Sequence, residues 1–173
     1  DAFMGDPAFV DIPLAGLLSK AYARDRAASI DPARASKQGA GRPAAYEGDS
    51  TTHLSVMDSA GNTVALTQTV ESFFGCASVL AGYGFILNNQ MQDLDPVPGH
   101  PNSVAPGKKP LSSMSPTVVL RDGRPFLTVG SPGSKRIITA VVQVLSNIID
   151  HGMGIQEAID APRIHTDGAE LHI

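Results

Sequence analysis

The sequence predicts a layered α+β domain, and three observations support that prediction. Two segments alternate polar and apolar residues on either side of a short turn, which is the pattern of an antiparallel hairpin. A long apolar segment with helical periodicity follows the second hairpin. The 173 residues are 42% hydrophobic and 17% charged, so the chain can bury a core and is not disordered.

The N-terminal part divides into a helix and a linker. Residues 12–29 carry apolar side chains at helical spacing, which predicts an amphipathic helix. Residues 31–50 are rich in Pro, Gly, Ala and charge, which is typical of a mobile linker. This linker marks the internal boundary of the chain.

The middle of the chain predicts strands and a long loop. Residues 53–58 and 63–70 form the first hairpin, with the sequence SAGN in its turn. Residues 83–89 read as a short apolar strand with a polar exit. Residues 93–110 are too rich in proline for a helix or a strand interior, so we expect a loop there.

The second hairpin covers residues 115–130, with Asp122 and Gly123 in its turn. Residues 131–152 form a glycine-containing turn and a long helix, which Gly152 ends. We expect this helix to bury a broad face made of Ile137, Ile138, Val141, Val142, Val144, Leu145, Ile148 and Ile149.

The end of the chain predicts a short helix over residues 154–162 and a new strand over residues 170–173. The start of the chain shows neither an initiator methionine nor the basic and apolar regions of a signal peptide. We therefore interpret the sequence as a piece of a longer protein.

Composition disfavours several classes of function. The net charge of −4 gives no basic patch for nucleic acid, and no apolar run is long enough to cross a bilayer. The five histidines and the single cysteine lack the spacing of a zinc site, so we expect no metal and no cofactor. Cys76 lies among small and apolar residues, which predicts a buried side chain rather than a catalytic thiol.

Thr51 and Thr52 stand at the start of a strand, directly after a polar loop. Threonine is common in strands, so a purely structural role is one interpretation. The other is that cleavage makes one of them a new N-terminus. The α-amine, with a pKa of about 7.7–8.0, would then act as the base for the residue's own hydroxyl. The residues alone do not distinguish Thr51 from Thr52 as the nucleophile.

Three further features could assist such a nucleophile. The turn at residues 130–136 leads from a strand into a helix, where backbone N–H groups can hold an oxyanion, although a simple connecting turn would look the same. Serines within residues 111–116 suit a carboxylate. Asp93 and Glu71 could pair with a substrate ammonium group, or could be ordinary surface charges.

Five segments, taken together and in order, resemble the γ-glutamyltranspeptidase family of N-terminal-nucleophile hydrolases. They read TTHLSVMDSAGNTVALTQT, GFILNNQMQDL, KKPLSSMSPTVVL, GSPGSKRII and EAIDAPRIH. The resemblance implies part of a four-layer α/β/β/α sandwich. It also implies that residues 1–50 end the large subunit and that residues 51–173 form most of the small, catalytic subunit.

The resemblance assigns roles to individual residues. Thr51 matches the nucleophile, Ser50–Thr51 matches the bond cut by autoproteolysis, and Thr69 matches the threonine whose hydroxyl bonds the nucleophile. The donor's α-amino group is implied to meet Glu71, Gln90 and Asp93, its α-carboxylate Ser112 and Ser113, and the oxyanion the backbone amides of Gly133 and Ser134.

The implied reaction is ping-pong transfer of a γ-glutamyl group, from glutathione or another γ-glutamyl amide, through an ester on Thr51 to an amino acid, a peptide or water. The implied partner is the rest of the large subunit, including an arginine that binds the donor carboxylate. Relatives of this kind in bacteria are commonly periplasmic or secreted.

The sequence departs from the family pattern in two places. Ser134 replaces the second glycine of the usual Gly-Gly pair, which is costly if the backbone there has a positive φ. The loop over residues 93–108 is short and has no aromatic residue, as in members without a lid, so a larger or even polymeric γ-glutamyl substrate would fit. Two alternatives therefore stay open: a related glutaryl or amide acylase, and a non-catalytic homologue or fragment that binds small anions.

Overall fold

The structure is a computed structural model that describes residues 4–28, 51–166 and 171–172. It divides into two units. The first unit comprises Asp1–Ala44 and Met91–Leu111, and the second comprises Ala45–Gln90 and Ser112–Ile173. The linker predicted over residues 31–50, which includes Ser50, lies outside the described residues.

The single amphipathic helix predicted over residues 12–29 is wrong. The first unit instead has two helices, α1 (Leu14–Leu17) and α2 (Lys20–Ala28), and neither buries a residue. The helix is interrupted because the Ser19 hydroxyl accepts a 3.0 Å hydrogen bond from the backbone N–H of Tyr22. Ser19 is therefore an N-cap that starts a new helix, and its capping preference overrides the continuous apolar periodicity.

The loop predicted over residues 93–110 is confirmed, because it contains only the end of the 3₁₀ helix η1 (Gln90–Asp93) and one isolated bridge. The buried Asp6 carboxylate holds this loop by accepting the backbone N–H of Lys109 at 2.9 Å and that of Ala8 at 3.0 Å. These two N–H groups keep the pKa of Asp6 below its usual value.

The second unit begins with the first predicted hairpin, which is confirmed. Strands β1 (Thr51–Met57) and β2 (Thr63–Thr69) pair antiparallel along their whole length. Asp58 closes the turn, since its carboxylate accepts the backbone N–H of Ala60 at 2.9 Å and that of Asn62 at 2.8 Å. This Asx-type bonding explains why the polar turn sequence fixes the register of the strands.

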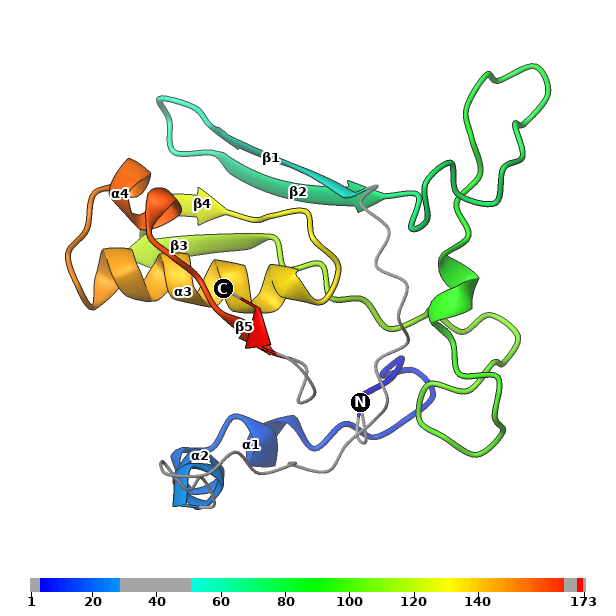
Figure 1. Ribbon diagram of the computed structural model, residues 1–173, viewed down its shortest axis with the longest axis horizontal. Coiled ribbons are helices and arrows are strands. Elements are labelled where there is room, and N and C mark those ends of the chain that lie inside the picture. Colours follow the sequence, from blue (N-terminus) through cyan, green and yellow to red (C-terminus); the bar gives the residue numbers. More distant parts are fainter. Residues whose placement is uncertain (1–3, 29–50, 167–170, 173) are drawn as a thin grey trace. The chain divides into compact units, whose positions relative to one another are not determined.

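The second hairpin is also confirmed, with β3 (Thr117–Arg121) and β4 (Arg124–Val129). Asp122 and Gly123 have φ of 53° and 76°. Two positive φ values in a two-residue turn match the right-handed twist of the flanking strands. Figure 1 shows this hairpin between the β1–β2 hairpin and the long helix α3 (Arg136–Ile149), which gives the second unit three layers.

The core of the second unit lies between β4, α3 and the short helix α4 (Ile155–Asp160). Both helices were predicted. The predicted apolar face of α3 is only partly buried: Ile137, Val141 and Val144 are buried, whereas Ile138, Val142 and Ile149 are about half exposed. The expectation of one broad buried face is therefore wrong, because the hairpin and α4 cover only one side of the helix.

Two other predictions fail in the segment after β2. Residues 83–89 form no strand, and only Ile86 makes an isolated bridge, to Val79. Gly82 and Gly84 take positive φ values of 82° and 73°, so the chain turns tightly there and offers no row of pairing groups. Cys76 is exposed instead of buried, because this loop projects without a packing layer over it.

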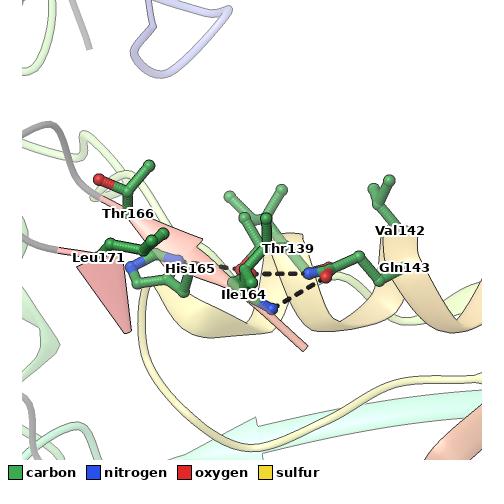
Figure 2. A pocket seen from close by; sticks show the side chains of 8 residues that line it. Thr139, Val142, Gln143, Ile164, His165, Thr166 and Leu171 are labelled. Carbon is green, nitrogen blue, oxygen red and sulfur yellow. Dashed lines mark hydrogen bonds between the residues drawn. The ribbon is translucent and has the colours of Figure 1, made fainter. Parts of the chain in front are cut away.

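The final strands, β5 (His165–Thr166) and β6 (Leu171–His172), pair antiparallel, so the predicted C-terminal strand is confirmed. The Gln143 side chain on α3 bonds both backbone groups of Ile164, at 2.8 and 3.0 Å. Figure 2 shows the apolar hollow that results between α3 and this segment. None of the predicted site residues lines it.

Candidate active site

The centre of the candidate site is the open end of the β1–β2 hairpin. The antiparallel register places Thr51, the first residue of β1, directly opposite Thr69, the last residue of β2. The Thr51 hydroxyl donates a 3.1 Å hydrogen bond to Thr69 Oγ1. Both residues are half-buried, so the pair is shielded from bulk water and still reachable by a ligand.

The Thr69 hydroxyl oxygen has a second partner, the backbone N–H of Glu71 at 2.8 Å. This bond explains how Glu71 is held at φ 75°, a region that non-glycine residues seldom adopt. One oxygen atom therefore fixes both the Thr51 hydroxyl and the sharp bend that places Glu71 beside it. Strained backbone of this kind concentrates at functional sites.

The loop that follows Glu71 returns to the same end of the hairpin. The Asn89 side chain accepts the Ser72 backbone N–H at 3.0 Å and donates to the Ser72 hydroxyl at 2.8 Å. The backbone N–H of Asn89 also bonds the carbonyl of Val70 at 3.2 Å. Asn89 thereby brings Gln90 back to the end of β2, close in the fold to Glu71.

The turn before α3 has positive φ values at two successive residues. Gly133 has a φ of 127° and Ser134 a φ of 51°. The positive φ expected to be costly for serine is therefore present at Ser134. The carbonyls of Gly133 and Ser134 accept the N–H groups of Arg136 at 2.9 Å and Ile137 at 3.1 Å, which begin the helix.

The two predicted carboxylate-binding serines differ in their bonding. The Ser113 hydroxyl donates a 2.9 Å hydrogen bond to the carbonyl of Ser134 and so braces the turn. The exposed Ser112 hydroxyl accepts the N–H of Met114 at 3.2 Å, so its own proton is available to a ligand. Because a hydroxyl has only one proton, Ser112 is the stronger candidate donor to a carboxylate.

The second unit thus contains two groups of predicted site residues: Thr51, Thr69 and Glu71 form one, and Ser113 with Ser134 forms the other. Asp93 belongs to the first unit, where the Asn102 side chain donates to its carbonyl at 2.6 Å. Ser50, the other side of the expected scissile bond, lies outside the described residues.

Sequence reasoning missed two residues that bring strand β1 into contact with the segment before the turn at Gly133. His53 was considered only as a metal ligand, and Gly130 only as part of the turn. The His53 ring lies so close to Gly130 that a Cβ at this position would overlap it. The position of His53, two residues after Thr51 in sequence, could have indicated that both side chains lie on the same face of β1.

The described part of the chain has no group of three or more His, Cys, Asp or Glu side chains arranged to hold a metal ion. Among the same residues, no helix is both long and apolar enough to cross a membrane. The donor set at the open end of the hairpin consists of hydroxyls, an amide and backbone N–H groups, which suits acyl chemistry with an oxygen nucleophile.

Sequence comparisons place this geometry in a family. The family model described as γ-glutamyltranspeptidase matches residues 1–172. The glutathione hydrolase proenzyme of Escherichia coli is 46% identical over 94% of this chain and 30% of its own length. An acylase ACY 1 proenzyme from a Pseudomonas species is 44% identical over 97% of this chain and 30% of its own length. The chain thus spans less than a third of these two relatives.

A shorter relative shares most of its length with this chain. It is an Arabidopsis thaliana glutathione hydrolase homologue whose name doubts its activity. It is 34% identical over 94% of this chain and 93% of its own length.

Solved structures agree with the sequence comparison. A mutant of Helicobacter pylori γ-glutamyltranspeptidase matches with a TM-score of 0.64 and 48% identity, over 69% of this chain and 71% of that chain. A cephalosporin acylase from Bacillus halodurans matches with a TM-score of 0.83 and 27% identity, over 95% of this chain and 29% of that chain. The α+β fold class is thereby confirmed, and the chain belongs to the γ-glutamyltranspeptidase family.

Proposed function

We propose that this chain carries the nucleophile of a γ-glutamyl hydrolase and transferase, with Thr51 as the N-terminal nucleophile after cleavage of the Ser50–Thr51 bond. The observation that carries the proposal is the 3.1 Å hydrogen bond from the Thr51 hydroxyl to Thr69. It orients a hydroxyl at the start of a strand, next to a strained bend that would present Glu71 to a substrate.

In the proposed reaction, the free α-amine of Thr51 takes the proton from its own Oγ1 as this oxygen attacks the γ-carbonyl carbon of the donor. The amides of Gly133 and Ser134 stabilise the oxyanion. The amide bond then breaks, and the leaving amine takes the proton from the Thr51 ammonium group. Water or an amino acid attacks the resulting γ-glutamyl ester, which regenerates the free hydroxyl.

Glutathione and other γ-glutamyl amides are the proposed donors. Glu71, Gln90 and Asp93 would recognise the α-amino group, with the Asp93 carboxylate as an ion-pair partner. Ser112 would donate to the α-carboxylate, since the Ser113 proton is already bonded to the carbonyl of Ser134. No cofactor takes part in this scheme.

We also propose that the full-length protein, meaning the product of the complete gene, forms the four-layer α/β/β/α sandwich. Residues 1–50 would end its large subunit and residues 51–173 would belong to its small subunit. The outer face of the β1–β2 hairpin supports this, because its apolar side chains are exposed in this chain. They are Leu54, Val56, Val64 and Leu66, each at least 43% exposed, and a further helical layer would cover them. By the family resemblance, the proposed location is the periplasm or the outside of the cell.

Replacement of the nucleophile tests the proposal in the full-length protein. Thr51→Ala should abolish release of the aniline from a γ-glutamyl anilide, whereas Thr51→Ser should retain part of it, since serine keeps an Oγ. Turnover by Thr51→Ala at the rate of the unchanged protein would refute the assignment.

Amide acylase activity is the second candidate, favoured by the 44% identity to an acylase proenzyme. A glutaryl substrate lacks the α-amino group and would gain nothing from Glu71 or Asp93. Comparison of a γ-glutamyl anilide with a glutaryl anilide separates the two activities. A higher kcat/KM for the glutaryl compound would establish the acylase, and absence of turnover with both would favour a non-catalytic homologue.

A further inference from the structure

We propose that His53 is a positioning residue that ties the strand carrying Thr51 to the turn at Gly133 and Ser134. The proposal rests on the function proposed above and names a residue that the function did not require. The face of the β1–β2 hairpin that meets β4 is polar, although apolar side chains usually fill the space between two packed hairpins.

The His53 ring uses both of its nitrogens within this layer. Nδ1 lies 2.7 Å from the hydroxyl of Thr67, its cross-strand partner on β2. Nε2 lies 3.0 Å from the hydroxyl of Ser55, which lies 3.3 Å from the hydroxyl of Thr128 on β4. The Thr128 hydroxyl in turn donates to the carbonyl of Thr117 at 3.2 Å. The ring therefore joins β1, β2 and β4 through one continuous set of hydrogen bonds.

The ring also packs directly on Gly130, the first residue after β4, where any side chain would collide with it. Gly130 is not one of the positive-φ glycines in the described part of the chain, so its backbone conformation does not require glycine. The close approach of His53 is the physical reason for glycine at this position.

These contacts connect the strand that carries Thr51 with the segment that leads to the turn at Gly133 and Ser134. Along β1 it lies two residues after Thr51, and at Gly130 it touches the segment that reaches Gly133 three residues later. A half-buried ring whose two nitrogens are bonded and whose edge meets backbone has little freedom to move. It therefore sets the separation between the nucleophile strand and the oxyanion turn, a distance to which acyl transfer is sensitive.

The test uses the full-length protein with His53→Ala, His53→Asn and Gly130→Ala. Gly130→Ala displaces the ring and leaves His53 itself intact. The control is His151→Ala, which removes an exposed histidine after α3. Kinetics with a γ-glutamyl anilide, the rate of self-cleavage and the melting temperature are measured for each protein.

We expect His53→Ala and Gly130→Ala to lower kcat by about 10- to 100-fold, because small displacements of reacting groups have effects of this size. KM should change by less than about threefold, because His53 has no contact with substrate in this account. His53→Asn should recover part of kcat, since an amide nitrogen can replace Nδ1 opposite Thr67.

A kcat within about twofold of the unchanged protein in folded His53→Ala and Gly130→Ala would overturn the proposal. So would a loss confined to KM, or no recovery by His53→Asn. Where His53→Ala does not fold, Gly130→Ala and Thr67→Val decide by the same criteria. An unchanged protein that neither cleaves itself nor turns over substrate would instead refute the proposed function.

Discussion

Removal of the Thr69 hydroxyl would test how the proposed nucleophile Thr51 is oriented. This hydroxyl accepts two hydrogen bonds, from the Thr51 hydroxyl at 3.1 Å and from the Glu71 N–H at 2.8 Å. Thr69→Val keeps the shape of the side chain and removes both bonds. Thr69→Ser keeps the oxygen and removes only a methyl group.

Two such bonds contribute about 1–3 kcal/mol in total. If both act in the transition state, their loss slows the reaction by about 5- to 150-fold, at about 1.4 kcal/mol for each tenfold change. We therefore expect Thr69→Val to lower kcat for a γ-glutamyl anilide within this range. Thr69→Ser should stay within about threefold of the unchanged protein, because the acceptor oxygen survives.

The matched control is Thr63→Val, the same chemical change at the other end of β2, where the hydroxyl donates to the carbonyl of Gly61 at 3.3 Å. This variant should keep its rate. The assay is steady-state kinetics of the full-length protein, together with its melting temperature. Equal rates for Thr69→Val and Thr63→Val in folded proteins would refute the argument that Thr69 orients the nucleophile.

Two further predictions concern strain and charge. Ser134→Gly should retain activity and change the free energy of unfolding by no more than about 1 kcal/mol, since relief of the positive φ offsets the greater freedom of glycine in the unfolded chain. Denaturant titration of this variant and of Ser134→Val, which should be clearly less stable, measures the difference. Equal stability of the two variants would contradict the prediction. Asp6 has a lowered pKa, so its contribution to stability is present above the usual carboxyl value and is lost as pH falls through the folded value. Asp6→Asn should therefore lower the free energy of unfolding at pH 7. Between about pH 5 and about pH 2 the variant should lose less of this free energy than the unchanged protein, as urea midpoints would measure. An identical loss in the two proteins would show that Asp6 is not responsible.

The elements predicted correctly are those whose signals are local. In both hairpins, polar and apolar residues alternate on either side of a turn. Asp122-Gly123 supplies the two positive φ values that the second turn needs. The opposition of Thr51 and Thr69 follows from the same signal, because a fixed turn fixes the register of every pair along the hairpin.

The errors arise where tertiary structure decides. Periodicity alone could not show that Ser19 would cap a new helix, or that the covering of α3 would stop at one side. Residues 83–89 have strand composition, yet a strand requires a partner, and the glycines turn the chain before one is reached. Cys76 is exposed for the related reason that its loop has no packing layer over it.

The site shows the same division. The resemblance indicated Thr51 and Thr69, and the hairpin brings them into contact. His53 and Gly130 lie more than 70 residues apart in sequence, so only the folded chain reveals the contact between them. Ser112 and Ser113 likewise look equivalent in sequence. Only the structure shows that the Ser113 hydroxyl donates to the carbonyl of Ser134.

Self-cleavage at Ser50–Thr51 is tested by the intact mass of the full-length protein after incubation near neutral pH, with N-terminal sequencing of any fragment. We predict two fragments whose masses sum to the intact chain plus one water, the smaller beginning at Thr51. Thr51→Ala should stay in one piece. A fragment that begins at Thr52, or normal cleavage of Thr51→Ala, would contradict the assignment of Thr51 as the self-generated nucleophile.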